Sequence, residues 1–242
     1  MALPRFDLPV YHIVLPVSKT KVAFRAYTAR EEKLLLIAKE AGGEGEIELA
    51  VKQIVKNCAD IDDADDLCQA DRDYLLLQLR SKVNGNIESL TYICKSVDAV
   101  GEEKVCGGNL DVDIDLDSIT TTSTLSNVIK LGSIGMTVKV PSINEMKKAG
   151  TANVKFLAEK KIALIYISLV NIFENDDVTE KRDITFKEFE EWYLSMPSNY
   201  YKLVNEFFDN LPDISFTTDV KCPKCGVSHS ITLRGIEDFF PS

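Results

Sequence analysis

The sequence predicts an α+β fold in which an N-terminal β-hairpin and helical segments accompany two cysteine-bearing β-hairpins, packed as a zinc-ribbon-like module. Three observations support this prediction. Apolar and polar residues alternate in several short segments, which is typical of strands with one buried face. Ser or Thr followed three residues later by Glu precedes several apolar runs, which is the signature of a helix capping box. Two segments carry a cysteine on each side of a turn, then a glycine, then a strand pattern.

Length and composition favour a soluble globular protein. The 242 residues are 45% hydrophobic and 27% charged, enough for one large domain or two small ones. The net charge of −10 argues against nucleic-acid binding, which needs clustered Lys and Arg, and favours protein partners. The first 16 residues lack the apolar stretch of a signal peptide, and six cysteines are too few for a disulfide-dense secreted fold. We therefore expect reduced thiols in a cytosol and no membrane span.

Four segments follow from the order of the patterns. We expect an N-terminal hairpin and helices over 1–85, a β-rich segment with the first cysteine hairpin over 86–141, and a helical segment over 142–212. The C-terminal cysteine hairpin over 213–242 is expected to pack on 86–117.

The N-terminal part reads as a hairpin followed by three helices. Residues 10–16 and 21–27 alternate around a polar turn, and Thr28 with Glu31 forms a capping box for the first helix. A second helix follows a glycine-rich break, and Asp71 is expected to cap a third. The acidic loop at 59–66 lacks the glycine and glutamate that an EF-hand needs in register, so we read it as a solvated loop.

The remaining chain predicts strands and then helices. Residues 87–94 and 109–117 read as strands, and a further hairpin is expected around 132–135. Ser142 with Glu145 caps a short helix, a long helix is expected from Thr151 to about Phe173, and Thr185 caps the next one through a box with Glu188. The aromatic residues at helical spacing in 186–208 are read as core, part of which could form a protein contact surface.

The cysteines carry the candidate site. Cys222 and Cys225 flank a C-P-x-C-G turn between two strands, which is the shape of a zinc knuckle. Upstream, Cys94 and Cys106 have the same plan with a longer loop, and Cys106 is also followed by glycine. One knuckle supplies two of the four ligands that a structural zinc requires. The two segments therefore predict a site in which all four cysteines surround one ion.

Alternatives to a bound zinc remain open at this point. The repeat could keep a zinc-ribbon geometry without metal, or His229 could replace one ligand. A thiol oxidoreductase would place C-x-x-C before a helix, whereas here a strand follows. A nucleic-acid-binding ribbon would exploit Lys221 and Lys224, but the surrounding chain is acidic. Cys58 and Cys68, on expected helices, are read as buried structural thiols.

No catalytic or cofactor-binding set is predicted. The sequence contains neither of the two glycine-rich phosphate-loop patterns nor H-E-x-x-H, and its two histidines have no evident nucleophile beside them. The residues with a recognisable role form caps, turns and a candidate metal site.

The ordered motifs resemble a known family. The opening "LPVYHIVLPVSKTKVAFRAYTAREEKLLLIAKE" is followed by "TYIC", "VCGG", "EFFDNLP", "CPKCG" and "LRGIEDFF". This order is similar to that of the baseplate hub proteins of T-even-like contractile-tailed bacteriophages, nearly end to end. The chain departs from the family pattern at Ala26, where proline is expected.

The resemblance implies a non-enzymatic structural or assembly component of the phage baseplate hub. Its partners would be other hub or tail proteins. It would be made in the host cytoplasm, and it could either remain in the tail baseplate of the virion or, like some family members, act as an assembly factor that leaves the particle. A zinc-ribbon nucleic-acid module and a CxxC thiol oxidoreductase remain the alternative functions.

Overall fold

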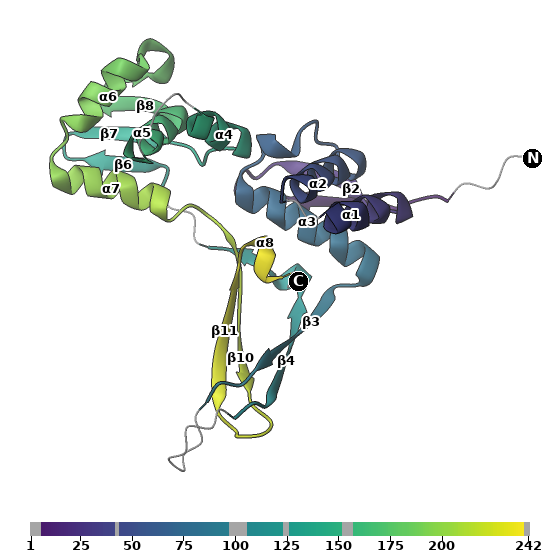
Figure 1. Cartoon of the computed structure of the whole chain (residues 1–242). Coiled ribbons are helices and arrows are strands. Elements are labelled where there is room, and N and C mark those ends of the chain that lie inside the picture. The colour runs from purple at the N-terminus through teal and green to yellow at the C-terminus, as the bar shows by residue number, and fades with distance from the viewer. Residues whose placement is uncertain (1–5, 42–43, 97–105, 123–125, 152–156, 240–242) are drawn as a thin grey trace, which may run out of the picture. The chain divides into compact units, whose positions relative to one another are not determined.

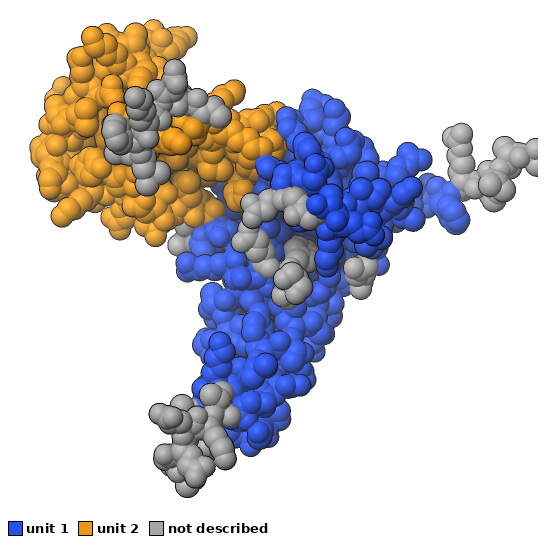
Figure 2. Space-filling view, viewed as in Figure 1, with its two compact units in different colours: residues 1–64, 70–122, 213–242 blue, residues 65–69, 123–212 orange. Residues whose placement is uncertain are grey.

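The computed structural model describes residues 6–41, 44–96, 106–122, 126–151 and 157–239. The chain forms two compact units (Figures 1 and 2). Unit 1 comprises residues 1–64, 70–122 and 213–242, and unit 2 comprises residues 65–69 and 123–212. The architecture is α+β, with an N-terminal hairpin and helices, as the sequence predicts.

Unit 1 begins with the expected hairpin. Strand β1 (Val10–Val14) pairs antiparallel with β2 (Lys21–Arg25), and Tyr11 lies opposite Phe24. Helices α1 (Ala29–Ala41) and α2 (Glu44–Cys58) follow. The predicted cap is present: the Thr28 amide donates to the Glu31 carboxylate at 2.8 Å, and the Thr28 hydroxyl accepts from the Arg30 amide at 3.3 Å. A 3₁₀ turn, η1 (Ala64–Asp66), follows the acidic loop.

Asp71 does not cap the third helix, which corrects the sequence prediction. Helix α3 (Gln69–Asn84) begins before Asp71, so this residue lies in the first helical turn. Its buried carboxylate instead accepts hydrogen bonds from the amides of Val17 and Ser18, both at 2.8 Å. The Asp71 carboxylate does accept from backbone amides, as a cap would. Those amides belong to the β1–β2 turn and not to the start of α3.

Two long hairpins complete unit 1. Strand β3 (Ile87–Ile93) pairs with β4 (Asn109–Asp115), and β10 (Ile214–Lys221) pairs with β11 (Ser228–Arg234). The strict alternation predicted for β4 is observed, with every apolar residue buried and every aspartate exposed. The short strand β5 (Thr120–Thr121), after η2 (Leu116–Ser118), adds to β10, and α8 (Gly235–Asp238) follows β11. Buried side chains of α3 and both hairpins share one core: Leu77, Leu90, Val112, Ile114, Leu116, Ile119, Ile214, Leu233 and Phe239.

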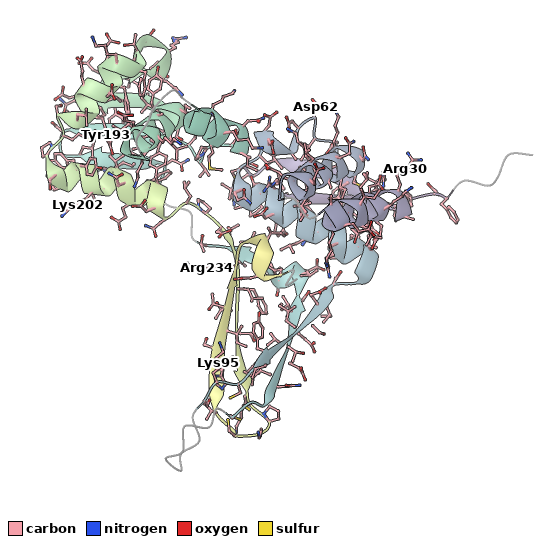
Figure 3. All side chains as sticks on the ribbon, in the orientation of Figure 1. Arg30, Asp62, Lys95, Tyr193, Lys202 and Arg234 are labelled. Carbon is pink, nitrogen blue, oxygen red and sulfur yellow. The ribbon has the colours of Figure 1, made fainter. Side chains whose placement is uncertain are left out.

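Unit 2 is a four-stranded antiparallel sheet with helices packed on it. The strand order is β6 (Val128–Leu131), β7 (Ile134–Val138), β8 (Leu169–Glu174) and β9 (Asp177–Glu180). Helix α4 (Ile143–Thr151) precedes α5 (Leu157–Ser168), and η3 (Lys181–Asp183) leads into α6 (Phe186–Leu194) and α7 (Ser198–Asp209). Except for the exposed Tyr201, the aromatic residues of α6 and α7 enter or pack against this core as predicted, and Tyr193, labelled in Figure 3, is fully buried.

The expected long helix to Phe173 is wrong. Helix α5 ends at Ser168, and the next six residues form strand β8. The segment "IALIYISLVNIF" is apolar throughout, so its pattern cannot distinguish a buried helix from a central strand. The predicted boxes at Ser142 and Thr185 are both present, with their glutamates accepting from the cap amides at 3.0 and 2.8 Å. No helix in the described ranges is long and apolar enough to cross a bilayer.

The main segment of unit 2 is an insertion into unit 1. It leaves after Thr122 and returns at Asp213, and the backbones of these two residues are hydrogen-bonded at 2.8 Å. The Asp213 amide also donates to the Thr122 hydroxyl at 2.9 Å. The strands on either side of the insertion, β5 and β10, are therefore neighbours in one sheet.

Candidate metal centre

The two cysteine hairpins bring four sulfur atoms together, as the repeat predicts. The Sγ atoms of Cys94, Cys106, Cys222 and Cys225 all lie within 4.8 Å of one another. Two contacts cross between the hairpins, at 3.7 Å from Cys94 to Cys225 and 3.8 Å from Cys106 to Cys222. Lys95, labelled in Figure 3, marks this end of unit 1, and Arg234 marks the opposite end of the long hairpins. The site joins the segments before and after the insertion.

The two turns share one backbone geometry. The carbonyl of the first cysteine in each pair accepts from a glycine amide, with Gly107 bonded to Cys94 at 3.0 Å and Gly226 to Cys222 at 2.9 Å. Both glycines have positive φ, 63° and 75°, which a residue with a Cβ rarely adopts. The amides of Cys94 and Cys222 in turn donate to the residues that follow these glycines, both at 2.8 Å. The sequence repeat is therefore a structural repeat, despite the longer loop after Cys94.

A second glycine allows the two turns to approach each other. A Cβ placed on Gly108 would lie 2.9 Å from Lys224 Cβ and 3.0 Å from Cys222 Sγ. The first distance is shorter than real Cβ contacts and the second is tight, so a side chain at position 108 would force the two turns to shift.

The sulfur spacing suits a tetrahedral metal ion. Four thiolates at about 2.3 Å from one zinc lie about 3.8 Å from each other, and the two cross-hairpin distances are 3.7 and 3.8 Å. A disulfide would require sulfurs about 2.0 Å apart, and all six cysteines are free. Three of the four cysteines are buried and Cys225 is half-buried. The four cysteines could therefore bind a metal within a closed site.

Backbone amides aimed at the sulfurs favour thiolates. Hydrogen bonds from the backbone amides of Cys225 and Lys224 lower the pKa of Cys222 to about 7, although burial acts in the opposite direction. Hydrogen bonds from the Ser96 hydroxyl and amide likewise lower the pKa of Cys94. At Cys106 the Gly108 amide acts in the same direction, but burial and the neighbouring sulfurs raise the pKa to about 12. A cation would relieve this repulsion between thiolates.

Three neighbours of the sulfurs lie outside the predicted ligand set. His229 Nε2 lies 3.2 Å from Cys94 Sγ and 3.2 Å from the Ser96 hydroxyl. The Lys224 ammonium donates to the Cys106 carbonyl at 2.5 Å. His229 is thus a neighbour of a complete four-sulfur set. The sequence analysis identified all four cysteines but not the contributions of Ser96 and Gly108 to the site. Each has a local signal, because Ser96 lies two residues after Cys94 and Gly108 follows Gly107 directly.

The other two cysteines lie outside the four-sulfur cluster. Cys58, at the end of α2, is buried, and burial raises its pKa to about 11. Cys68 is also buried, but it precedes α3 and does not lie on a helix, which corrects its expected placement. A buried thiol with a raised pKa is a poor nucleophile, so Cys58 is suited to packing.

Together, the fold and site define an α+β protein whose two hairpins share a four-cysteine cluster. Residues 8–241 match the family model described as T4 bacteriophage base plate protein. The chain belongs to this family. The match covers both cysteine hairpins and the inserted unit.

One curated relative covers nearly the whole chain. It is the baseplate hub assembly protein gp26 of Enterobacteria phage T4, 23% identical over 232 residues. The alignment spans 95% of this chain and 97% of the relative. No solved structure matches the chain.

Proposed function

We propose that this protein is a non-enzymatic assembly component of the phage tail baseplate hub and acts by protein–protein contacts. The end-to-end similarity to a hub assembly protein is the observation that carries the proposal. Its partners are other hub or tail proteins, and it works in the host cytoplasm while the baseplate is built. Membership of a base plate family over residues 8–241 supports the same role.

We further propose that Cys94, Cys106, Cys222 and Cys225 hold one structural zinc ion. The support is the sulfur spacing, the amides directed at the sulfurs and the burial of the ligands. Structural zinc sites use four protein ligands, whereas catalytic sites keep one position open for water or substrate. A set of four sulfurs therefore fits a zinc that stabilises the fold and takes no part in a reaction. In this role the ion fastens together the two hairpins that flank the insertion.

The assembly role is tested by reconstitution. The purified chain is combined with the individually purified hub proteins of the same phage, and complexes are measured by analytical ultracentrifugation. We expect a stable complex with at least one hub protein and a higher yield of assembled hubs. If the folded, metal-replete chain neither binds a hub protein nor changes the yield, the proposed role is wrong.

A further inference from the structure

Strand β1 has one edge that no described residue covers. The Leu15 amide donates to Thr20 at 2.9 Å, which fixes the hydrogen-bonding phase of the β1–β2 ladder. In β1 the backbone N–H and C=O groups of the odd-numbered residues point toward β2. Those of Val10, His12 and Val14 therefore point away from β2. Ala23 of β2, opposite His12, shows the same pattern, because its backbone groups point away from β1. Its amide donates to the Asp60 carboxylate, and its carbonyl accepts from the Asp60 amide. Among the described residues, nothing donates to or accepts from the three outward backbone positions.

This edge also lacks the charges that protect other edges. Lys, Asp or Glu on an edge strand discourages pairing with another chain. The described edge strands β3, β4, β6, β9 and β11 each carry at least one Asp, Glu, Lys or Arg, and β2 is covered by Ala59 and Asp60. Apart from the two-residue β5, only β1, with the sequence VYHIV, has none. An unprotected edge is expected where another strand covers it.

The side chains on this strand add an apolar surface. Val10 and Val14 are 61% and 52% exposed, on the same face as His12. Phe6 and Leu8, just before the strand, are also exposed. Aliphatic side chains spaced two residues apart match a partner strand that presents apolar residues at alternate positions.

The charges near the edge indicate the character of the partner. Residues 6–25 contain two exposed lysines, Lys19 and Lys21, and a single acid, Asp7, while Arg25 is ion-paired with the buried Glu31. Lys21 is exposed and lies opposite Val14. A second copy of this chain would bring the same basic side chains to the edge, so like charges would meet. An acidic segment of another protein is complementary to it.

We propose that β1 is a docking edge that accepts an extended segment of another hub protein as an added β-strand. The segment carries apolar residues at alternate positions with acidic residues beside them. Pro9 and Pro16 bound the edge, so the added strand pairs over about five residues. This inference rests on the proposed function, which supplies the class of partner, and it names the surface that the partner contacts.

Two variants test the edge without disturbing the hairpin. His12→Pro removes an amide that faces away from β2, so the β1–β2 ladder keeps its hydrogen bonds. Val14→Glu places a negative charge on the exposed face, opposite Lys21, where it would repel an acidic segment. The matched control is Val178→Glu on β9, where an equally accessible valine, 56% exposed, lies on an edge strand that already has charges. All three variants are expected to melt within a few degrees of the unmodified chain.

The readouts are affinity for each purified hub protein and amide hydrogen exchange of the complex. We expect His12→Pro and Val14→Glu each to weaken binding by about tenfold or more, and Val178→Glu to bind normally. The amides of Val10, His12 and Val14 should exchange quickly in the free chain and become protected in the complex.

The outcomes separate this inference from the proposed function. If the unmodified chain binds no hub protein, both are wrong. If it binds and the two edge variants bind equally well, the assembly role stands and the docking edge is overturned. If the edge variants instead abolish self-association of the free chain while leaving partner binding intact, a second copy occupies the edge and the proposal is also overturned.

Discussion

The sulfur atoms of Cys94 and Cys225 lie 3.7 Å apart although 131 residues separate them in the chain. The contact between Cys106 and Cys222 also crosses from one hairpin to the other. Each hairpin therefore supplies one member of both close pairs. We therefore expect the loss of any one sulfur to weaken the link between the hairpins, whichever hairpin it comes from.

We predict that Cys94→Ser and Cys222→Ser destabilise unit 1 to a similar extent. Structural zinc contributes its binding free energy to folding, so the loss of one ligand should lower the free energy of unfolding by roughly 3 kcal/mol or more. Chemical denaturation followed by circular dichroism measures this loss, and metal analysis of the purified variants measures bound zinc.

Cys58→Ala is the control for the cysteine variants, because Cys58 is a buried thiol outside the cluster. It should retain one zinc per chain. A near-neutral effect at either Cys94 or Cys222, with the other strongly destabilising, would contradict a shared site.

Gly108→Ala should weaken the site without removing a ligand. The added methyl group would lie 2.9 Å from Lys224 Cβ and 3.0 Å from Cys222 Sγ, so the two turns must move apart. We expect a lower melting temperature and weaker zinc binding in competition with a chromogenic chelator. Gly45→Ala is the matched control, because nothing lies within 4 Å of its Cβ position, and in helix α2 alanine is more stable than glycine by up to about 1 kcal/mol. Equal zinc affinity in both variants would show that the turns tolerate separation.

Glu31 predicts a pH-dependent contribution to stability. Burial alone would raise its pKa, but hydrogen bonds from Thr28 and Arg25 lower it from 4.5 to about 2. Because the folded pKa lies below the unfolded one, the ionised group stabilises the fold above about pH 4.5. This contribution is lost as the pH falls toward 2. Glu31→Gln should therefore be less stable than the unmodified chain at pH 7, and the two should converge near pH 2 in denaturation experiments.

Glu188→Gln is the comparison for Glu31→Gln. Its capping box with Thr185 has the same hydrogen bonds, but the side chain is exposed and no arginine contacts it in the described structure. We expect a smaller pH-dependent difference for this variant. Curves for Glu31→Gln that run parallel to those of the unmodified chain from pH 7 to 2 would exclude the predicted titration.

Removing the metal should affect unit 1 alone. Among the described residues around the sulfurs, one aliphatic side chain, Leu110, is buried, and Tyr92 and Val220 are only partly buried. Little packing remains to hold the tips of the hairpins when zinc is withdrawn. A chelator should therefore increase amide exchange in β4 and β10 near the cluster. Emission from Trp192, the single tryptophan and part of the unit 2 core, should not change. A shift of that emission on adding chelator would mean that the two units do not respond separately.

The sequence predicted the parts of the structure that depend on local chemistry. The boxes at Thr28, Ser142 and Thr185 form because a hydroxyl and a glutamate three residues apart can satisfy free helix amides without help from the rest of the fold. The cysteine cluster was also predictable, because a thiol pair with a following glycine appears twice.

The failures come from positions decided by distant residues. Asp71 binds amides that are more than fifty positions away. The apolar run after Ile162 becomes a strand from Leu169 because β7 and β9 pair with it. The need for glycine at position 108 follows from the approach of Lys224, and the open edge of β1 depends on which side of β2 is covered. The role of Asp71, the strand from Leu169 and the open edge of β1 have no local pattern, and Gly108 is marked only by its place after Gly107.

The insertion between Thr122 and Asp213 imposes an order of events during synthesis. The ribosome makes Cys222 116 residues after Cys106, so at about 5 to 20 residues per second the first thiol pair waits roughly 6 to 23 seconds for the second. Residues 123–212 emerge during that interval and can fold before the cluster is complete. Closure of the four-sulfur cluster therefore marks a late step in the maturation of each newly made chain.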